Sequence, residues 1–163
     1  MADAPHLTPI EVGLTAAIVA VEAEEPRILV DGAHNAASIE ALMRAIGQNI
    51  PYDSMVVIFG CCADKDVDGM LQHIQLGADK VIFTRINSPR TADPAELAAR
   101  FIETSGRMAQ TAPSLEAALE IAEKAVTRED LICVAGSFIL VGEAKDLFEA
   151  RLHRQTTGMI QNQ

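Results

Sequence analysis

The sequence is poor in aromatic residues. It contains no tryptophan and one tyrosine, and aromatic residues make up 4% of its 163 positions, so aliphatic side chains must build the core. Hydrophobic residues account for 49% and charged residues for 22%, an ordinary globular composition that excludes disordered, collagen-like and small disulfide-rich proteins. Because single domains contain roughly 100–200 residues, the length predicts one domain and leaves no room for two full enzyme domains.

Basic residues are also scarce. The 13 lysines and arginines are outnumbered by 23 aspartates and glutamates, which gives a net charge of −10. Such a surface repels a phosphate backbone, so we expect no nucleic-acid partner. One local basic pocket for a small anion remains compatible with this charge.

Cysteines are few and unsuited to a disulfide framework. They are Cys61, Cys62 and Cys133, and the adjacent pair cannot close an unstrained bridge, which favours a reducing compartment. That pair is also too close for a C-x-x-C zinc site, so we expect no metal site in this chain. The longest apolar stretch, Val12 to Val21, is about half as long as a membrane span, and no basic leader precedes it. These features predict a cytoplasmic protein without a membrane partner.

Three familiar motifs are missing from the sequence. No G-x-x-x-x-G-K-[ST] segment is present to cradle a nucleoside triphosphate, and residues 31–35 depart from G-x-G-x-x-G, which argues against hydride transfer. No G-x-S-x-G elbow surrounds Ser137, which argues against a hydrolase nucleophile.

Short aliphatic runs alternate with amphipathic segments through most of the chain. The alternation is typical of a mainly parallel sheet covered by helices on both faces. We expect strands at 27–31, 55–59, 80–84, 107–111 and 131–135, and helices at 36–46, 67–76, 94–102, 115–126 and 138–152. The predicted domain is therefore 27–152.

The two ends of the chain carry weaker signals. Thr8-Pro9-Ile10-Glu11 fits a capping box with proline at the first helical position, which predicts a helix over 9–24 within an N-terminal segment, 1–26. The polar tail at 153–163 is expected to fray.

Four loops follow the predicted strands, and ligands of such sheets gather outside the carboxyl ends of the strands. In the first loop, Asp31, His34 and Asn35 can bind ribose hydroxyls, phosphate or carboxylate beside a helix N-terminus. The same residues suit a plain turn and helix cap. Spacing alone does not separate the two interpretations.

The other three loops are 60–66, 85–92 and 136–137. Arg85 and Arg90 can hold a phosphate or carboxylate, or form surface salt bridges. Ser137 can bind a substrate or act as a helix N-cap, and Asp64 or Asp66 can cap the helix after its own loop.

Taken together, the loops carry a recognisable set of segments. They are Asp31-Gly32-Ala33-His34-Asn35, Phe59-Gly60 with Asp64-Lys65-Asp66, Ser88-Pro89-Arg90, and Ala135-Gly136-Ser137-Phe138 with Gly142-Glu143. In this order they resemble the C-terminal domain of folylpolyglutamate synthase and dihydrofolate synthase, a branch of the Mur ligase superfamily. The resemblance extends from Glu25 to Phe148 and implies a Rossmann-like, three-layer αβα domain with a mainly parallel sheet.

The resemblance also implies an activity. Family members use ATP to phosphorylate a folate or dihydropteroate carboxylate, and the amino group of L-glutamate then attacks the acyl phosphate to form an amide. The residues implicated are Asp31 for the nucleotide ribose, His34, Asn35 and Lys65 for the nucleotide and acyl phosphate side, and His34, Arg90 and Ser137 for glutamate. His34 is the single candidate for a catalytic role.

Three positions depart from the family pattern. Ala36 stands after Asn35 where the family usually has proline, and Ile139 stands two residues after Ser137 where an aromatic residue is usual. A Trp-Pro-Gly-Arg segment before the first strand is missing. These departures bear on glutamate specificity and on the interdomain hinge more than on the fold.

The family's N-terminal ATPase domain, with its phosphate loop and most of its Mg²⁺ ligands, has no counterpart in this sequence. We therefore expect the chain to be inactive by itself, with residues 1–26 as the remnant of an interdomain connection. Two alternatives remain open: a free-standing domain that binds nucleotide or glutamate without catalysis, and a domain for protein association through Ile18, Val19 and Val21. Dihydrofolate synthesis and polyglutamate synthesis are not separated by these residues.

Overall fold

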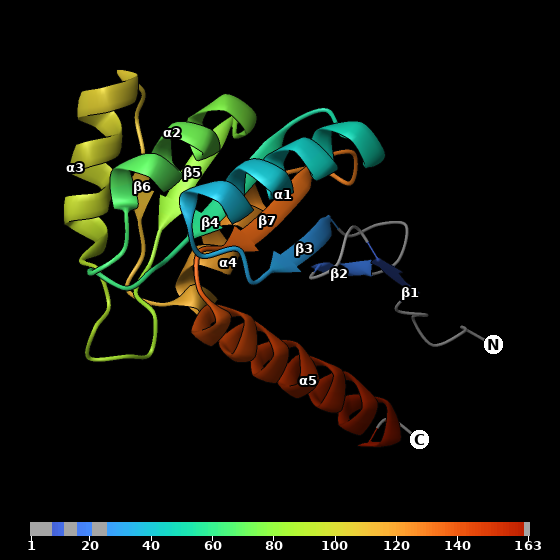
Figure 1. Ribbon diagram of the computed structural model, residues 1–163. Helices are drawn as coiled ribbons and strands as arrows, with labels where there is room; N and C mark the ends of the chain where they lie inside the picture. Colours follow the sequence, from blue (N-terminus) through green and yellow to red (C-terminus); the bar gives the residue numbers. More distant parts are fainter. Residues whose placement is uncertain (1–7, 12–15, 21–25, 162–163) are drawn as a thin grey trace.

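The computed structural model describes residues 8–11, 16–20 and 26–161 and shows one seven-stranded sheet (Figure 1). Across the sheet the strands are β1 (Thr8–Glu11), β2 (Ala16–Ala20), β3 (Arg27–Asp31), β7 (Leu131–Ala135), β4 (Met55–Phe59), β5 (Lys80–Phe83) and β6 (Gln110–Thr111). The five strands from β3 to β6 are parallel, whereas β1 and β2 are antiparallel additions at the edge. The mainly parallel α/β sheet predicted from the sequence is confirmed.

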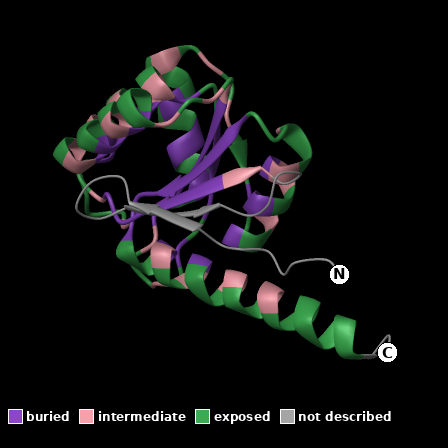
Figure 2. Cartoon of the chain, turned by 90° about the vertical axis from the view of Figure 1, so that its right-hand side faces the viewer, coloured by how far each residue is buried: buried purple, intermediate pink, exposed green. Residues whose placement is uncertain are grey.

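Helices cover both faces of this sheet and complete three layers. They are α1 (Ala36–Asn49), α2 (Val67–Gly77), α3 (Pro94–Ser105), α4 (Leu115–Ala125) and α5 (Phe138–Gln161). α1, α2 and α3 pack in one buried cluster, and α4 with the first turns of α5 in another. Figure 2 shows the buried strands enclosed between these helical layers. Within the described residues, no helix is long and apolar enough to cross a bilayer.

Each central strand contributes side chains alternately to the two buried clusters. In β7, Leu131, Cys133 and Ala135 face the α1–α3 side, while Ile132 and Val134 face the α4–α5 side. Successive side chains of a strand point to opposite faces, and here both faces are buried, which is why the strands read as continuous aliphatic runs.

The helix starts follow the predicted capping signals. Asn35 accepts a hydrogen bond from Ser38 N at 2.8 Å, and Ser38 Oγ accepts one from Asn35 N at 3.1 Å, which forms a reciprocal capping box. Asp93 caps α3 and Ser114 caps α4, by accepting from Ala95 N and Ala117 N. These local signals fix the residue at which each helix begins, next to the carboxyl edge of the sheet.

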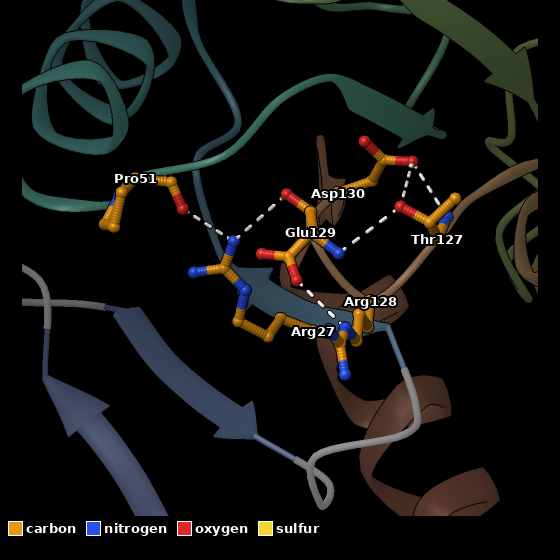
Figure 3. A network of polar contacts seen from close by, with 6 residues as sticks. All are labelled: Arg27, Pro51, Thr127, Arg128, Glu129 and Asp130. Atoms are coloured by element: carbon orange, nitrogen blue, oxygen red, sulfur yellow. Dashed lines mark hydrogen bonds and ion pairs between the residues drawn. The ribbon is translucent and has the colours of Figure 1, made fainter.

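A polar network closes the opposite edge, where the parallel strands begin (Figure 3). Arg27 Nη2 donates to Pro51 O at 2.6 Å. The Asp130 carboxylate accepts from Thr127 N at 2.8 Å and from Ser54 N at 3.1 Å. These hydrogen bonds, that of Thr127 first, lower the pKa of Asp130. The network joins the loops that precede β3, β4 and β7, and it lies away from the predicted ligand loops.

The prediction of a helix over 9–24 is wrong. Thr8–Glu11 and Ala16–Ala20 are strands, and β2 pairs with β3 so that Ile18 stands opposite Leu29. The β-branched Ile18 and Val19 favour a strand, and the edge of β3 supplies the backbone partners that a local capping pattern does not reveal. Residues 12–15 and 21–24 of the predicted helix lie outside the described residues.

The C-terminal boundary was also misplaced. α5 continues to Gln161, so residues 153–161 are helical where a frayed tail was predicted. Thr156 and Thr157 Oγ1 donate to the carbonyls of Leu152 and His153, one turn earlier, at 3.0 and 2.9 Å. These bonds keep the polar hydroxyls compatible with a helix. The short strand expected at 107–111 is reduced to Gln110–Thr111.

Candidate functional site

The loops that follow β3, β7, β4 and β5 lie next to one another along the carboxyl edge of the sheet, as the strand order requires. Main-chain hydrogen bonds join them in sequence. Gly136 N donates to Ala33 O at 2.8 Å, and Gly60 N donates to Ala135 O at 3.3 Å. We call this edge, formed by residues 31–35, 60–66, 85–92 and 136–138, the carboxyl rim.

Asp31 ends β3 and is almost fully buried, with 4% of its surface exposed. Its Oδ1 accepts a hydrogen bond from Ala33 N at 2.7 Å, which holds the first turn of the loop. Burial raises the pKa of this carboxyl group, and the hydrogen bond from Ala33 partly opposes that effect. Asp31 therefore presents a fixed acceptor to any hydroxyl that reaches the rim.

His34 is half-buried three residues after Asp31. Its Nδ1 lies 2.9 Å from Gly32 O, and its ring centroid lies 4.9 Å from that of Phe138, the first residue of α5. The contact brings the loop after β3 directly against the loop after β7.

Asn35 is exposed and caps α1 through its side-chain oxygen, so the structural interpretation of this residue is realised. Within residues 26–161, its amide nitrogen donates to no protein group. The cap leaves that nitrogen available to a ligand beside the positive end of α1.

Ser137 is buried to 6% exposure where β7 passes into α5. Its Oγ accepts from Ile139 N at 3.0 Å, so it acts as a helix cap. Its hydroxyl hydrogen donates to no group among the described residues and can therefore donate to a ligand. The preceding Gly136 has φ +117°, and a Cβ at this position would lie 2.8 Å from Phe59 Cε2. Only glycine fits there, which explains the Gly-Ser sequence.

Lys65 and Arg90 belong to the part of the rim beyond β4. Both are exposed, and the Arg90 guanidinium forms an ion pair with Asp64. The hydrogen bond from Arg90 lowers the pKa of Asp64. Main-chain bonds from Ala63 N to Arg90 O and from Ala92 N to Cys61 O, each 2.8 Å, hold the two loops together. The salt-bridge interpretation of Arg90 is therefore realised.

The structure thus divides the six predicted site residues into two groups. Asp31, His34, Asn35 and Ser137 lie on two adjoining loops, whereas Lys65 and Arg90 lie on the loops after β4 and β5. No hydrogen bond or ion pair between described residues links the side chains of the two groups. Gly136 and Gly60, which lie in contact, connect the two groups through the main chain.

The thiols and acidic groups of the described residues form no metal site. No group of three or more histidine, cysteine, aspartate or glutamate side chains is placed to hold an ion in residues 8–11, 16–20 and 26–161. Burial raises the pKa of Cys61 to about 12 and also raises that of Cys133. Both thiols pack as small apolar groups.

Sequence reasoning missed two contacts that shape the rim. The sequence shows Phe138 only as part of a motif, yet its ring covers Gly32 and contacts His34. Glu143 Oε2, one turn further along α5, accepts from Asn87 N at 3.2 Å and ties α5 to the loop after β5. The aromatic residue directly after Ser137 was the signal available for the first contact. Nothing local signalled the second.

A shallow pocket lies beside the rim between α2 and α3. Its volume is about 30 Å³, which is room for little more than water. The residues that line it are Ala63, Val67, Ala92, Asp93, Glu96, Leu97 and Arg100. None of the six predicted site residues lines this pocket, so it is not the binding site that the rim indicates.

Comparison with known proteins places the chain in a family. The family model described as Mur ligase, glutamate ligase domain, matches residues 18–138. The dihydrofolate synthase/folylpolyglutamate synthase of Mycobacterium tuberculosis is 30% identical over 137 residues, which cover 76% of this chain and 28% of that protein. The corresponding protein of Escherichia coli is 28% identical over 134 residues, 80% of this chain and 30% of its own length.

Solved structures agree with this result. A Mycobacterium tuberculosis folylpolyglutamate synthase complexed with ADP and AMPPCP superposes with a TM-score of 0.72 at 31% identity, over 76% of this chain and 30% of that one. Escherichia coli FolC in complex with DHPP and ADP superposes with a TM-score of 0.71 at 25% identity, over 80% and 30%. The chain spans less than a third of the length of these relatives.

Proposed function

The chain belongs to the Mur ligase family, in which it corresponds to the C-terminal, glutamate ligase domain, and from this premise we propose that its carboxyl rim contacts glutamate and nucleotide in an ATP-dependent ligase. The ligase would add glutamate to folate or dihydropteroate through an acyl phosphate. The observation that carries the proposal is the meeting of Asp31, His34 and Ser137 on two adjoining loops. Relatives solved with ADP and with DHPP support the assignment of substrates.

The rim supplies the groups that this chemistry needs. The Asp31 carboxylate would accept hydrogen bonds from ribose hydroxyls, and the Asn35 amide would donate to a phosphate oxygen near the N-terminus of α1. The Ser137 hydroxyl would donate to the glutamate carboxylate. Amide formation from an acyl phosphate depends mainly on positioning and charge stabilisation, which a covering domain provides by closing over both substrates.

Lys65 and Arg90 would add positive charge at the far part of the rim. Arg90 is the glutamate-carboxylate candidate, and Asp64 holds its guanidinium against the loop. Lys65 is exposed and would reach the nucleotide phosphates. Because both groups are solvated, their contribution depends on exclusion of water when the partner domain closes.

ATP and Mg²⁺ are the cofactors implied for the complete enzyme. Magnesium prefers six oxygen ligands, usually one or two carboxylates with phosphates and water. The described part of the rim offers one buried carboxylate, Asp31, whose Oδ1 is already bonded to Ala33 N. These residues do not fit a resident Mg²⁺ site, and we expect the ion's ligands in the partner domain.

A domain exchange tests the proposal. This chain replaces the corresponding domain of the Mycobacterium tuberculosis relative, and glutamate-dependent ADP formation is measured with dihydropteroate or folate. We expect activity in the chimera and none in the chain alone, because half of an interdomain site lacks the partner's contacts. Asp31→Asn and Ser137→Ala should each lower kcat/KM at least tenfold, about the loss of one charge-assisted hydrogen bond.

The control for this exchange is Asp53→Asn, an exposed aspartate near the opposite edge of the sheet. It should leave kcat/KM unchanged. Equal activity in the Asp31, Ser137 and Asp53 variants would contradict the assignment of the rim.

A further inference from the structure

The imidazole of His34 is held in one orientation by its surroundings. Its Nδ1 lies 2.9 Å from the carbonyl oxygen of Gly32. A carbonyl oxygen only accepts hydrogen bonds, so Nδ1 must carry the hydrogen. In the neutral ring Nε2 then has a lone pair and no hydrogen. Among the described residues, none forms a hydrogen bond with Nε2, which leaves this nitrogen to a ligand.

The ring of Phe138 is unusual for its exposure. It is 62% exposed and belongs to neither buried cluster, so burial does not explain an aromatic residue at this position. Its centroid lies 4.9 Å from that of His34, with the two rings tilted by 46°. This separation and tilt lie within the range of favourable aromatic pairs, so the two rings are in direct contact.

Gly32 is the third member of the contact between His34 and Phe138. A Cβ added there would lie 2.7 Å from Phe138 Cδ1, so the aromatic ring rests directly on the glycine backbone whose carbonyl receives the His34 hydrogen bond. We call Gly32, His34 and Phe138 the histidine clamp. It joins the loop after β3 to the start of α5, immediately beside Ser137.

From this geometry we infer that Phe138 is a positioning residue that keeps His34 in the Nδ1–H form, so that Nε2 accepts a hydrogen bond from the amino group of the substrate amino acid. The inference rests on the proposed function and deepens it. Phosphate and acyl phosphate oxygens carry no hydrogen to give, so neutral His34 cannot bond to them through Nε2. An amino group can donate. Ribose hydroxyls also donate, but the Asp31 carboxylate is the acceptor proposed for them, so the clamp points His34 to the amino-acid side of the site.

The tautomer of the neutral ring is measured directly by long-range ¹H–¹⁵N correlation spectra of the chain in alkaline solution. His34→Gln identifies the His34 signals by their loss. We expect wild type to show a protonated Nδ1 and an unprotonated Nε2. Phe138→Ala should give a mixture of both tautomers, and the conservative Phe138→Tyr should restore the single form.

The same variants in the domain-exchange chimera give a second readout. Phe138→Ala should raise the KM for glutamate in inverse proportion to the fraction of His34 that stays in the Nδ1–H form, about twofold for an equal mixture, and leave the KM for ATP unchanged. Phe138→Tyr should recover the wild-type value. Leu76→Ala is the matched control, because Leu76 is 80% exposed at the C-terminal end of α2, and it should change neither KM.

Three results would overturn the inference: a protonated Nε2 in neutral wild-type His34, an unaltered tautomer in Phe138→Ala, or a rise in the KM for ATP with that for glutamate unchanged. In each case the chimera's dependence on Asp31 and Ser137 still decides the proposed function separately. If His34 keeps the Nδ1–H tautomer but Asp31→Asn and Ser137→Ala leave the kcat/KM of the chimera unchanged, the proposed function is rejected instead.

Discussion

Gly136 is the residue on which the geometry of the carboxyl rim most depends. Its φ of +117° is costly for any residue with a Cβ, and an added Cβ would overlap with Gly60 O and approach Phe59. This residue brings Ser137 and Phe138 against the loop that holds Asp31 and His34. A single backbone conformation thus places residues that are a hundred positions apart in the sequence.

Replacement of Gly136 tests this requirement. We expect Gly136→Ala to lower the free energy of unfolding by about 2–4 kcal/mol, from backbone strain and overlap with the neighbouring loop. Gly142→Ala is the control, because a Cβ there meets nothing within 4 Å and Gly142 lies inside α5. It should raise stability by about 0.5–1 kcal/mol. Urea unfolding measures both, and equal effects would refute the conformational argument.

Asp130 provides a pH-dependent test at the opposite edge of the sheet. Hydrogen bonds from Thr127 and Ser54 lower its pKa in the folded state. Its contribution is therefore present above the unfolded-state pKa, about 3.9, and is lost as the pH falls through the lower folded-state value. Asp130→Asn should lower the free energy of unfolding by about 1–3 kcal/mol at pH 7. The gap to wild type should narrow steadily in urea titrations below pH 4.

The control for this pH series is Asp53→Asn, which changes an exposed aspartate in the same region. It should stay within about 0.5 kcal/mol of wild type at every pH. A gap for Asp130→Asn that widens as the pH falls would show that the hydrogen bonds favour the protonated carboxyl group instead.

At the scale of single residues, the sequence predicted caps better than contacts. Asn35, Asp93 and Ser114 act on main-chain groups two or three residues away, so local spacing reveals them. The ion pair of Arg90 with Asp64 spans 26 positions, and the contact of His34 with Phe138 spans a hundred. Such pairs exist only after the strands have been ordered.

At the scale of elements, the strands and helices that were predicted correctly are those with buried, periodic side chains. Four of the five parallel strands, β3, β4, β5 and β7, are apolar on both faces, whereas β6 is the exposed pair Gln110–Thr111. The amphipathic helices carry apolar residues at helical spacing. The edge strands β1 and β2 fall in the segment that was predicted as a helix. β2 pairs with the edge of β3 and β1 pairs with β2, so both strands depend on a sheet edge that the local pattern does not reveal. The Thr8-Pro9-Ile10-Glu11 pattern pointed to a helix instead.

The distal part of α5 gives a prediction at this scale. Residues 153–160 are all exposed, whereas Arg151 forms an ion pair with Glu123 at 2.7 Å and belongs to the part of α5 that packs on α4. Removal of residues 155–163 should therefore change the free energy of unfolding by less than about 0.5 kcal/mol and reduce the helical circular dichroism signal.

Truncation at Ala150, which also removes Arg151 and Leu152, is the comparison for this variant. It should be less stable than truncation at Arg154, because it removes the ion pair and partly buried apolar surface. A large loss of stability from the shorter truncation would mean that the end of α5 packs against a part of the chain outside the described residues.

At the scale of the whole molecule, the amino and carboxyl edges of the sheet differ in how their polar groups are used. At its amino edge, Ser54 Oγ donates to the Asp130 carboxylate, Thr127 N donates to the same carboxylate, and Arg27 donates to the main-chain carbonyl of Pro51. Its carboxyl edge carries Asp31, His34 and Ser137, each with hydrogen-bonding capacity left for a ligand. A domain built in this way can act as a cover, with one edge stabilising the fold and the other meeting a substrate.

The central claim is that the carboxyl rim is the face that meets nucleotide and glutamate. The most direct measurement is a titration of the isolated chain with ADP and then L-glutamate, followed through its ¹H–¹⁵N amide signals. The account predicts weak, millimolar binding with shifts concentrated at residues 31–35 and 136–138, because half of an interdomain site lacks the partner's contacts. Shifts centred on the amino edge around Asp130, or micromolar binding of nucleotide by this chain alone, would contradict it.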